Sequence, residues 1–455
     1  MAEDLTDRNA PATAPGHAPA NRATADRGWR YAWWLRAAFA VTILALPALT
    51  LWNATVAAAN PRLFVKIGPG IGGLNVPDPV PLSLDAIADG KFQRAVAHAI
   101  AGAMPTRPGL VRLNNDIAYT VFDKVNNTAV TRGDDGYLFE RHYVEEYCGR
   151  TADDARRLAE VAIPKLRELQ AYYRERGAVF LYVLTPGKMS QVPQYVTGRV
   201  HCPSTADARA RLVPDYVAHV RAAGIDVLDF ITATTRLSAD YHMPMFTKGG
   251  AHWNALASAH AAQAIAERID AETGRETIRP FRFTFVMSGR LPPLDRDLED
   301  AMTLLYGRMK DVSPHIIYDP AGGGCETSPA RTLNAAIVAG SFMHPIAEAL
   351  IGPGCAEKLK LYFYFYRSTF GGMPYDVTKT DLGDADFAAL RDARVMIVEE
   401  NELMIGRSRH LDLFWRTLTG RERGPMPGLK DLPHFISPPR QVSAQAGTAN
   451  ATGMN

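Results

Sequence analysis

The pattern of apolar and polar positions predicts an α/β chain over most of the sequence. Near-continuous apolar runs indicate buried strands, and these runs are AVFLYVL, IDVLDF, LNAAIVAGSF, KLKLYFYFY and RVMIVEEN. Helical periodicity lies between them, as over 151–177, over 206–222 and after His252. Strands that are apolar throughout must be covered on both faces. We therefore expect a mostly parallel sheet with helices on both faces, preceded by one transmembrane helix.

The transmembrane helix is expected between Arg36 and Arg62, where no charged residue occurs. Crossing a bilayer takes roughly 20 apolar residues, and this segment is long enough. Tryptophans flank both ends and arginines concentrate before it, which places the N-terminal side in the cytoplasm and everything after the segment outside. A cleavable signal peptide is the alternative, because ATVAAAN offers small residues to a peptidase. The arm before the segment is long for a signal and favours a retained anchor.

Composition divides the chain into five parts. Residues 1–30 are rich in Ala, Pro and polar residues and predict a disordered cytoplasmic tail, and 31–60 form the anchor. Residues 61–84 resemble a stalk, and 85–420 form the main folded domain. From 421 to 455 Pro, Gly, Ser and Ala predominate, which predicts a disordered C-terminal tail.

The charge balance excludes one class of partner. Fifty Lys and Arg face 48 Asp and Glu, for a net charge of +2, and no basic stripe is interleaved with aromatic residues. Proteins that bind nucleic acid usually carry such a positive surface. We expect no nucleic-acid partner.

The cysteines favour disulfides over a metal site. All four, which are Cys148, Cys202, Cys325 and Cys355, lie beyond the anchor, and an even set in an exported domain indicates two bridges with three connectivities. We predict Cys148 to Cys202 and Cys325 to Cys355, because consecutive pairing closes loops of moderate length. Buried free thiols are the alternative. Without CxxC spacing we expect no zinc site, and we expect no cofactor.

Ser341 is the candidate nucleophile. The apolar strand AAIVAG ends directly at this serine, and a helical pattern begins after it. A hydroxyl at the carboxyl end of a parallel strand lies where α/β folds place their sites, next to backbone N–H groups that could hold an oxyanion. A serine that only caps its helix is the competing interpretation.

His252 is the candidate base. It precedes Asn254, which is suited to cap the following Ala-rich helix. The positive end of that helix is expected to disfavour the imidazolium and leave a neutral ring that can accept a proton. A structural histidine beside a packed Trp253 is the alternative. His260 and His344 are placed on helix faces and are given no role.

Four segments together resemble one family. GDDGYLFE resembles its G-x-DGWLF motif, TPGKMSQVPQY its P-x-K segment, GGAHWN its D-x-HW block and VAGSF its serine turn, in the same order over roughly 85–410. The chain is therefore identified as similar to the AlgX/AlgJ-type polysaccharide O-acetyltransferases with an SGNH-hydrolase-like domain. As in that family, the histidine precedes the serine, and the short anchor resembles the membrane-tethered branch.

The resemblance implies roles for single residues and leaves one role open. Ser341 corresponds to the nucleophile, His252 to the general base, and Lys188 to the P-x-K lysine, which could bind substrate or be a solvated surface residue. The family's acid stands two residues before the histidine, where this chain has Gly250, so the usual Asp of the triad is expected to be absent. We propose Glu400, at the end of the strand RVMIVEEN, as a replacement that reaches His252, in preference to the neighbouring Glu399.

The implied function is transfer of acetyl groups to hydroxyls of an exported polysaccharide through a serine acyl-enzyme. The resemblance implies a single-pass protein of a bacterial inner membrane with a periplasmic catalytic domain, supplied with acetyl by a membrane-bound O-acyltransferase. A polysaccharide acetyl-esterase with the same residues, or a catalytically silent scaffold or polysaccharide-binding protein, are the alternatives. The aromatics Tyr362, Tyr364 and Tyr366 could stack on sugars but are assigned to a packed strand.

Overall fold

A computed structural model describes residues 22–67, 82–196, 198–307, 309–319, 324–368 and 382–420. The strands are β1 Val130–Arg132, β2 Leu138–Glu140, β3 Val179–Thr185, β4 Val227–Asp229, β5 Arg282–Ser288, β6 Ser313–Asp319, β7 Ala335–Ala339, β8 Lys360–Phe363, β9 Tyr366–Ser368 and β10 Val395–Asn401. The α-helices are α1 Arg22–Ala59, α2 Leu84–Ala88, α3 Lys91–Ala103, α4 Arg107–Val121, α5 Arg141–Gly149, α6 Asp154–Arg174, α7 Lys188–Gln191, α8 Ala206–Ala222, α9 Phe230–Asp240, α10 Ala255–Thr273, α11 Asp297–Ala301, α12 His344–Ile351, α13 Asp384–Arg391 and α14 Arg409–Thr419.

The chain divides into two compact units, Met1–Leu113 and Asn114–Asn455. Most of the expected N-terminal tail, the expected C-terminal tail at 421–455 and part of the expected stalk lie outside the described residues. Helix α1 begins at Arg22, so the last residues assigned to the N-terminal tail are helical.

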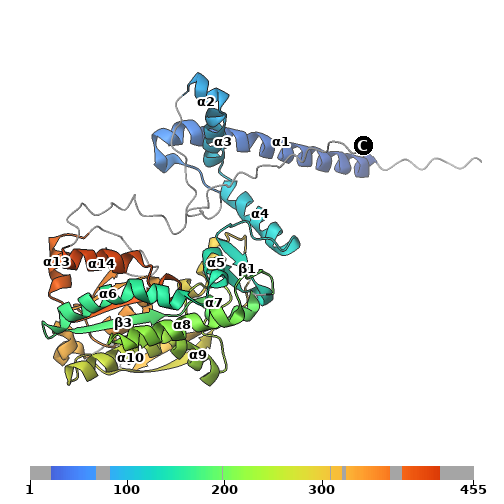
Figure 1. Ribbon diagram of the computed structural model, residues 1–455. Coiled ribbons are helices and arrows are strands. Elements are labelled where there is room, and N and C mark those ends of the chain that lie inside the picture. Colours follow the sequence, from blue (N-terminus) through green and yellow to red (C-terminus); the bar gives the residue numbers. More distant parts are fainter. Residues whose placement is uncertain are drawn as a thin grey trace, which may run out of the picture. The chain divides into compact units, whose positions relative to one another are not determined.

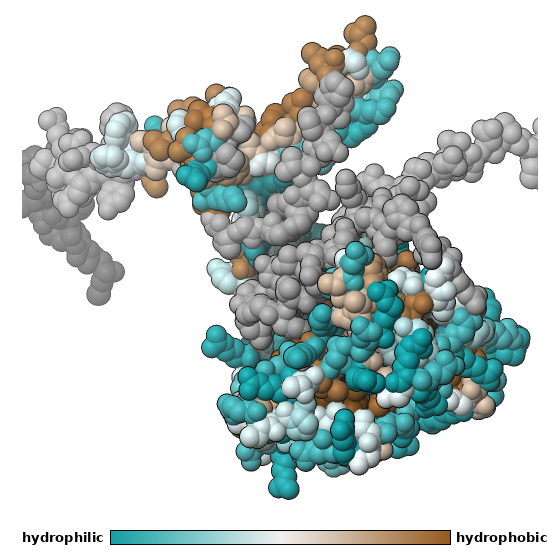
Figure 2. Space-filling view, turned by 90° about the vertical axis from the view of Figure 1, so that its left-hand side faces the viewer, coloured by the Kyte–Doolittle hydropathy of each residue, from teal (hydrophilic) through white to brown (hydrophobic). Residues whose placement is uncertain are grey.

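Helix α1 of the first unit is the candidate membrane anchor. Over Trp33–Val56 its mean hydropathy is 1.7, and among the described residues it is the one helix long and apolar enough to cross a bilayer. Its apolar side chains, such as Trp34 and Leu44, are largely exposed. Figure 2 shows brown over much of the first unit, whereas the described surface of the second unit in view is mostly teal. Length and composition therefore agree with an anchor.

The second unit is built on a six-stranded sheet with the order β4-β3-β10-β7-β8-β9. All neighbouring pairs are parallel except β8 and β9, which form an antiparallel hairpin. The mixed α/β class and the mostly parallel sheet expected from the apolar runs are confirmed (Figure 1). Because the parallel strands run in one direction, the residues after β3, β7, β8 and β10 gather at one edge of the sheet.

Two apolar cores cover the two faces of this sheet. In β3, Phe180, Tyr182 and Leu184 pack into the core made with α6, α8 and α14, whereas Leu181 and Val183 pack into the core made with α10 and α12. In Figure 1, α6 and α14 lie on one side of β3 and α10 lies on the other. Burial on both faces explains why β3 and β7 are apolar over nearly their whole length.

Two smaller β-elements lie outside the main sheet. The segment with Asp135 and Gly136 joins β1 to β2 as an antiparallel hairpin, a connection that an Asp-Gly pair favours. Strands β5 and β6 form a second antiparallel ribbon, which we did not predict. The side chains of β5 alternate between partly buried and exposed, and such a pattern carries a weaker signal than a fully apolar run.

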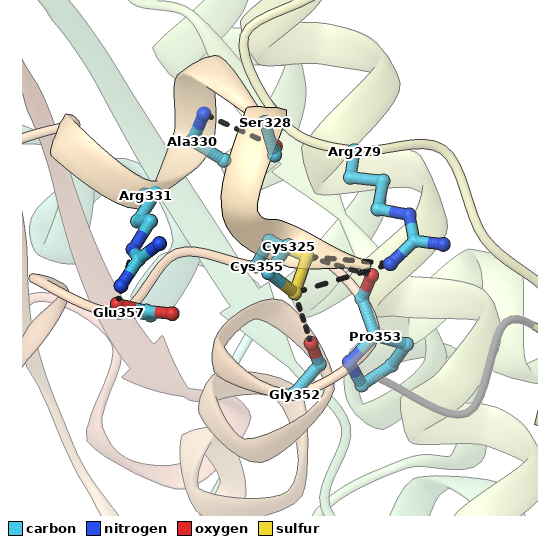
Figure 3. The surroundings of a disulfide bond; sticks show 9 residues. All are labelled: Arg279, Cys325, Ser328, Ala330, Arg331, Gly352, Pro353, Cys355 and Glu357. Atoms are coloured by element: carbon cyan, nitrogen blue, oxygen red, sulfur yellow. Dashed lines mark hydrogen bonds and ion pairs between the residues drawn. A yellow bond between two sulfur atoms is a disulfide. The ribbon is translucent and has the colours of Figure 1, made fainter. Parts of the chain in front are cut away.

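Both predicted disulfides are present, Cys148 to Cys202 and Cys325 to Cys355. The second bridge ties a short turn after β6 to the segment that follows α12 (Figure 3). The guanidinium of Arg279 lies beside it, with Nη1 3.6 Å from Cys355 Sγ. The bridge therefore fixes the far end of the helix that begins directly after the Ser341 turn.

Candidate active site

Ser341 stands at the carboxyl edge of the sheet, as the sequence predicted. Strand β7 is fully buried and ends at Ala339, and Ser341 opens a short 3-10 turn, Ser341–Met343, that leads into α12. The strand is central in the sheet, between β10 and β8, so the backbone that carries the serine is held on both sides. The serine itself is partly exposed, which makes its hydroxyl accessible.

His252 lies in the loop that leads into α10. Asn254 caps this helix, with its Oδ1 accepting from Ala257 N–H at 3.1 Å, as expected. Trp253 is buried and donates through Nε1 to the carbonyl oxygen of Phe342 at 3.2 Å. This bond joins the histidine loop to the serine turn, two segments that are far apart in the sequence.

The two candidate residues meet, and a third residue joins them. His252 Nε2 lies 2.7 Å from Ser341 Oγ, and His252 Nδ1 lies 2.7 Å from Asp297 Oδ2. Nucleophile, imidazole and carboxylate thus form a chain in the arrangement that Ser-His-Asp enzymes share. Such a chain can move the serine proton to Nε2 while the carboxylate holds Nδ1–H.

The expectation that the triad acid is absent is corrected by this geometry, since Asp297 supplies a carboxylate from α11. Its other oxygen accepts from the N–H groups of Ala251 at 2.7 Å and Leu298 at 2.8 Å, which fix its orientation. In sequence Asp297 stands among several acids in PPLDRDLED, and that cluster before a helix is the only signal it gives. Its spacing from His252 carries no information.

Gly250 explains why the acid comes from elsewhere. A Cβ built at this residue would lie 2.7 Å from the carbonyl oxygen of Leu294 and 2.7 Å from Thr247 Oγ1. A Cβ carbon does not approach other heavy atoms that closely, so no aspartate fits here without moving the segment before α11. That same segment leads directly to Asp297. The space that an aspartate side chain would need at Gly250 is therefore occupied by the backbone near Leu294, and this segment leads to Asp297, which binds His252 instead.

The prediction that Glu400 replaces the triad acid is wrong, because Glu400 does not contact His252. Both ring nitrogens of His252 already have partners, and Glu400 accepts from Tyr182 Oη and from the N–H groups of Gly406 and Ser408. Adjacent residues of a strand point to opposite faces, and Glu400 faces the core that contains Tyr182.

Glu399, on the other face of β10, comes closer to the site. Its Oε2 accepts from Gly340 N–H at 2.7 Å, and its Oε1 accepts from Thr185. Burial raises the pKa of Glu399 to about 7. Glu399 thus binds the backbone beside Ser341, and the carboxylate that contacts His252 is that of Asp297.

The electrostatics of His252 also differ from expectation. Burial disfavours the imidazolium, but the charge and hydrogen bond of Asp297, with Glu140 and Asp295 further away, outweigh it and raise the pKa of His252 above its ordinary value. The helix end was expected to act in the opposite direction, and the nearby carboxylates dominate. Glu140, at the end of β2, is itself affected, since burial raises its pKa to about 7.

Lys188 does not point to a substrate but binds the backbone of the loop that carries His252. It is 3% exposed, and its Nζ donates to the carbonyl oxygens of Thr247 at 2.7 Å, Lys248 at 2.9 Å and Gly250 at 2.7 Å. All three ammonium donors are engaged, so none is directed at a ligand. Burial lowers the pKa of Lys188 to about 7. Both earlier expectations, a substrate-binding and a solvated lysine, are corrected.

We expect Lys188→Met to loosen the loop that carries His252. The methionine fills similar volume but leaves three carbonyls without their donor, and a buried unsatisfied polar group costs about 1–3 kcal/mol. The free energy of unfolding and the turnover number should both fall. Lys248→Met is the matched control, because the Lys248 ammonium is partly exposed, where it pairs with Asp135 and lies over the Tyr137 ring. Urea unfolding and ester turnover that are unchanged in Lys188→Met would contradict this role.

Comparison with known proteins agrees with the geometry. Residues 130–304 match the sequence profile of the family described as SGNH hydrolase-like domain, acetyltransferase AlgX. This span contains Lys188, His252 and Asp297, while Ser341 follows it. Among curated proteins no relative was matched.

Several solved structures are similar to this chain. The O-acetyltransferase domain of Pseudomonas putida AlgJ has 15% identity and a TM-score of 0.40, covering 64% of this chain and 99% of that one. Pseudomonas aeruginosa AlgX has 14% identity and a TM-score of 0.41, covering 64% and 67%. Bacillus cereus PatB1 has 10% identity and a TM-score of 0.35, covering 61% and 97%.

The family match covers the segment that supplies two members of the Ser341, His252 and Asp297 chain. Residues 130–304 are therefore similar to the family described as SGNH hydrolase-like domain, acetyltransferase AlgX.

Proposed function

We propose that this protein transfers acetyl groups to hydroxyls of an exported polysaccharide through an acetyl ester on Ser341. The observation that carries the proposal is the continuous contact from Asp297 through His252 to Ser341, with both distances at 2.7 Å. The family match supports acetyl transfer as the reaction class. The resemblance of the four sequence motifs to polysaccharide O-acetyltransferases suggests a polysaccharide as the acceptor.

The first half-reaction loads the serine. His252 Nε2 takes the proton of the Ser341 hydroxyl while Oγ attacks the carbonyl carbon of an acetyl ester or thioester. The carbonyl electron pair moves onto oxygen and then returns, which breaks the bond to the leaving group. The leaving group departs with the proton from His252, and Asp297 stabilises the transient imidazolium.

The second half-reaction repeats these steps with a sugar hydroxyl. The hydroxyl gives its proton to His252 and attacks the acetyl carbon, and Ser341 Oγ leaves with that proton. Water in place of the sugar would give acetate, so transferase and esterase differ only in the acceptor. A site without a triad acid would favour a silent scaffold, whereas here Asp297 supplies a carboxylate to His252.

We propose in addition that α1 anchors the protein in an inner membrane with the second unit in the periplasm. The apolar span Trp33–Val56 and the two disulfides support this placement. A membrane-bound O-acyltransferase is the proposed acetyl source, since a shared membrane raises the local concentration of donor and acceptor enzymes.

The test uses the full chain in detergent with 4-nitrophenyl acetate and a panel of neutral and acidic oligosaccharides. Intact-protein and peptide mass spectrometry should find acetyl on Ser341, and acetylated sugar should form at the expense of acetate. Acetate alone with every acceptor would establish an esterase instead. A wild-type protein that is never acetylated would overturn the acyl-enzyme and favour a scaffold.

A further inference from the structure

The turn between β8 and β9 has an unusual backbone for its residues. Phe363 pairs with Tyr366, so the hairpin loop consists of Tyr364 and Phe365 alone. Their φ angles are 48° and 66°, both in the left-handed region. Two-residue loops of this kind favour Asn-Gly, because a bulky side chain is disfavoured at positive φ. Such strain persists only where the surroundings enforce it, and it concentrates at functional sites.

The surroundings of this turn do enforce it. The N–H of Tyr364 donates to the carbonyl oxygen of Ala339, the last residue of β7, at 2.8 Å. Phe365 is 1% exposed in the core beneath α14. The ring of Tyr364 contacts Phe363, with centroids 4.5 Å apart, and meets His410 edge-on at 5.8 Å. The aromatic ring is therefore held in one orientation beside the end of β7.

That orientation brings the phenol to the nucleophile. A Cβ at Gly340 would lie 3.3 Å from Tyr364 Oη, so the hydroxyl lies against the residue before Ser341. The backbone and the side chain of Ser341 both act on the Tyr364 hydroxyl and lower its pKa, although burial and the charge of Glu399 raise it more. The other N–H at this point, that of Gly340, is already engaged by Glu399. The hydroxyl thus lies beside the backbone that leads into the nucleophile.

We propose that Tyr364 is a further catalytic residue, whose phenolic O–H donates a hydrogen bond to the oxyanion that forms when Ser341 attacks an acyl carbonyl. The inference rests on the proposed function. In that step the carbonyl electron pair moves to oxygen, the Tyr364 proton stays on its own oxygen, and the pair returns when the leaving group departs. A donor aimed at a developing charge from a rigid support stabilises the transition state more than the ground state.

The protonation state of the phenol suits this role. Burial, with the negative charge of Glu399 adding to it, raises the pKa of Tyr364 to about 12. The group is therefore neutral throughout the range in which His252 works as a base, and its O–H is available as a donor. Glu399 contributes indirectly, by occupying Gly340 N–H and by keeping the phenol protonated.

The test is Tyr364→Phe, which removes only the hydroxyl and keeps the ring contacts. We expect kcat for 4-nitrophenyl acetate to fall about 10²-fold or more, the usual effect of losing an oxyanion donor, with KM changed less than threefold. The midpoint of thermal unfolding and the acidic limb of the pH–rate profile should stay as in wild type. Tyr362→Phe is the matched control, because its hydroxyl contacts the carbonyl oxygen of Asp386 on the other core.

The outcomes separate this proposal from the proposed function. A fluorophosphonate that labels Ser341 in wild type verifies the nucleophile, and slower labelling in Tyr364→Phe supports the oxyanion role. Labelled Ser341 with kcat of Tyr364→Phe within threefold of wild type would overturn the role of Tyr364 alone. If the loss of kcat in Tyr364→Phe is explained by a shift of the acidic limb of the pH–rate profile or by a lower unfolding midpoint, Tyr364 has a structural role and is not an oxyanion donor. Absence of any Ser341 label in wild type would refute the nucleophile itself.

Discussion

Ser341→Ala is expected to abolish acetylation of the polymer and ester turnover while the protein stays folded. The variant has no oxygen to carry the acetyl group, so the rate should fall on the order of 10⁵-fold or more, toward the reaction without a nucleophile. The variant loses only one partly exposed hydroxyl, so its midpoint of thermal unfolding should differ from that of wild type no more than surface substitutions usually do.

His252→Ala should be equally inactive, because a serine without its base is a weak nucleophile. Residues that act as one unit show non-additive losses, so the double variant should be no worse than either single variant. Ser258→Ala and His260→Ala are the matched controls, since both residues lie on α10 and contact the backbone or Tyr241. Retained polymer acetylation in cells with both Ser341→Ala and His252→Ala would show that the nucleophile is misassigned.

Asp297→Asn is expected to lower turnover by about 10³- to 10⁴-fold without unfolding the protein, as loss of the third triad member does in serine proteases. The amide nitrogen would donate to His252 Nδ1 and place the ring proton on Nε2, which then cannot accept the proton of Ser341. The carboxylate at 2.7 Å would also no longer stabilise the imidazolium. The residual activity would come from the nucleophile and the oxyanion donors.

The pH dependence gives an independent readout of Asp297. His252 must be neutral to accept a proton, so the rate rises with pH through the pKa of this residue. Asp297 is the largest contribution that raises that pKa. The acidic limb of the wild-type profile should therefore lie above the ordinary histidine value, and in Asp297→Asn it should move to lower pH.

Two variants separate this effect from a general loss of charge. Asp300→Asn removes a carboxylate from the same helix, where it forms an exposed pair with Arg296, and should leave the limb in place. Glu400→Gln should alter the buried network with Tyr182 and hence stability, but not the limb. An acidic limb that moves in Glu400→Gln and stays fixed in Asp297→Asn would reverse the assignment of the acid.

Features that depend on local patterns could be predicted from the amino-acid sequence. Apolar runs identified β3, β7 and β10, because a strand buried on both faces must be apolar along its length. The same reasoning placed Ser341 after a central strand and His252 before a capped helix, and the consecutive pairing of cysteines is present. Each of these features is encoded within a few residues of chain or in the order of its segments.

Only the tertiary structure decided which carboxylate serves His252. Asp297 lies 45 residues beyond the histidine, and no periodicity or spacing joins them. Strand alternation predicts that Glu399 and Glu400 point to opposite faces of β10, but it does not predict which of the two faces His252. The packing of the cores decides this, and Glu400 points into the core that contains Tyr182. The role of Lys188 could not be predicted either. Its ammonium binds backbone carbonyl oxygens of a loop about 60 residues further along the chain. Long-range contacts of this kind follow from how segments pack, and Gly250 shows the steric reason why the usual position of the acid was lost.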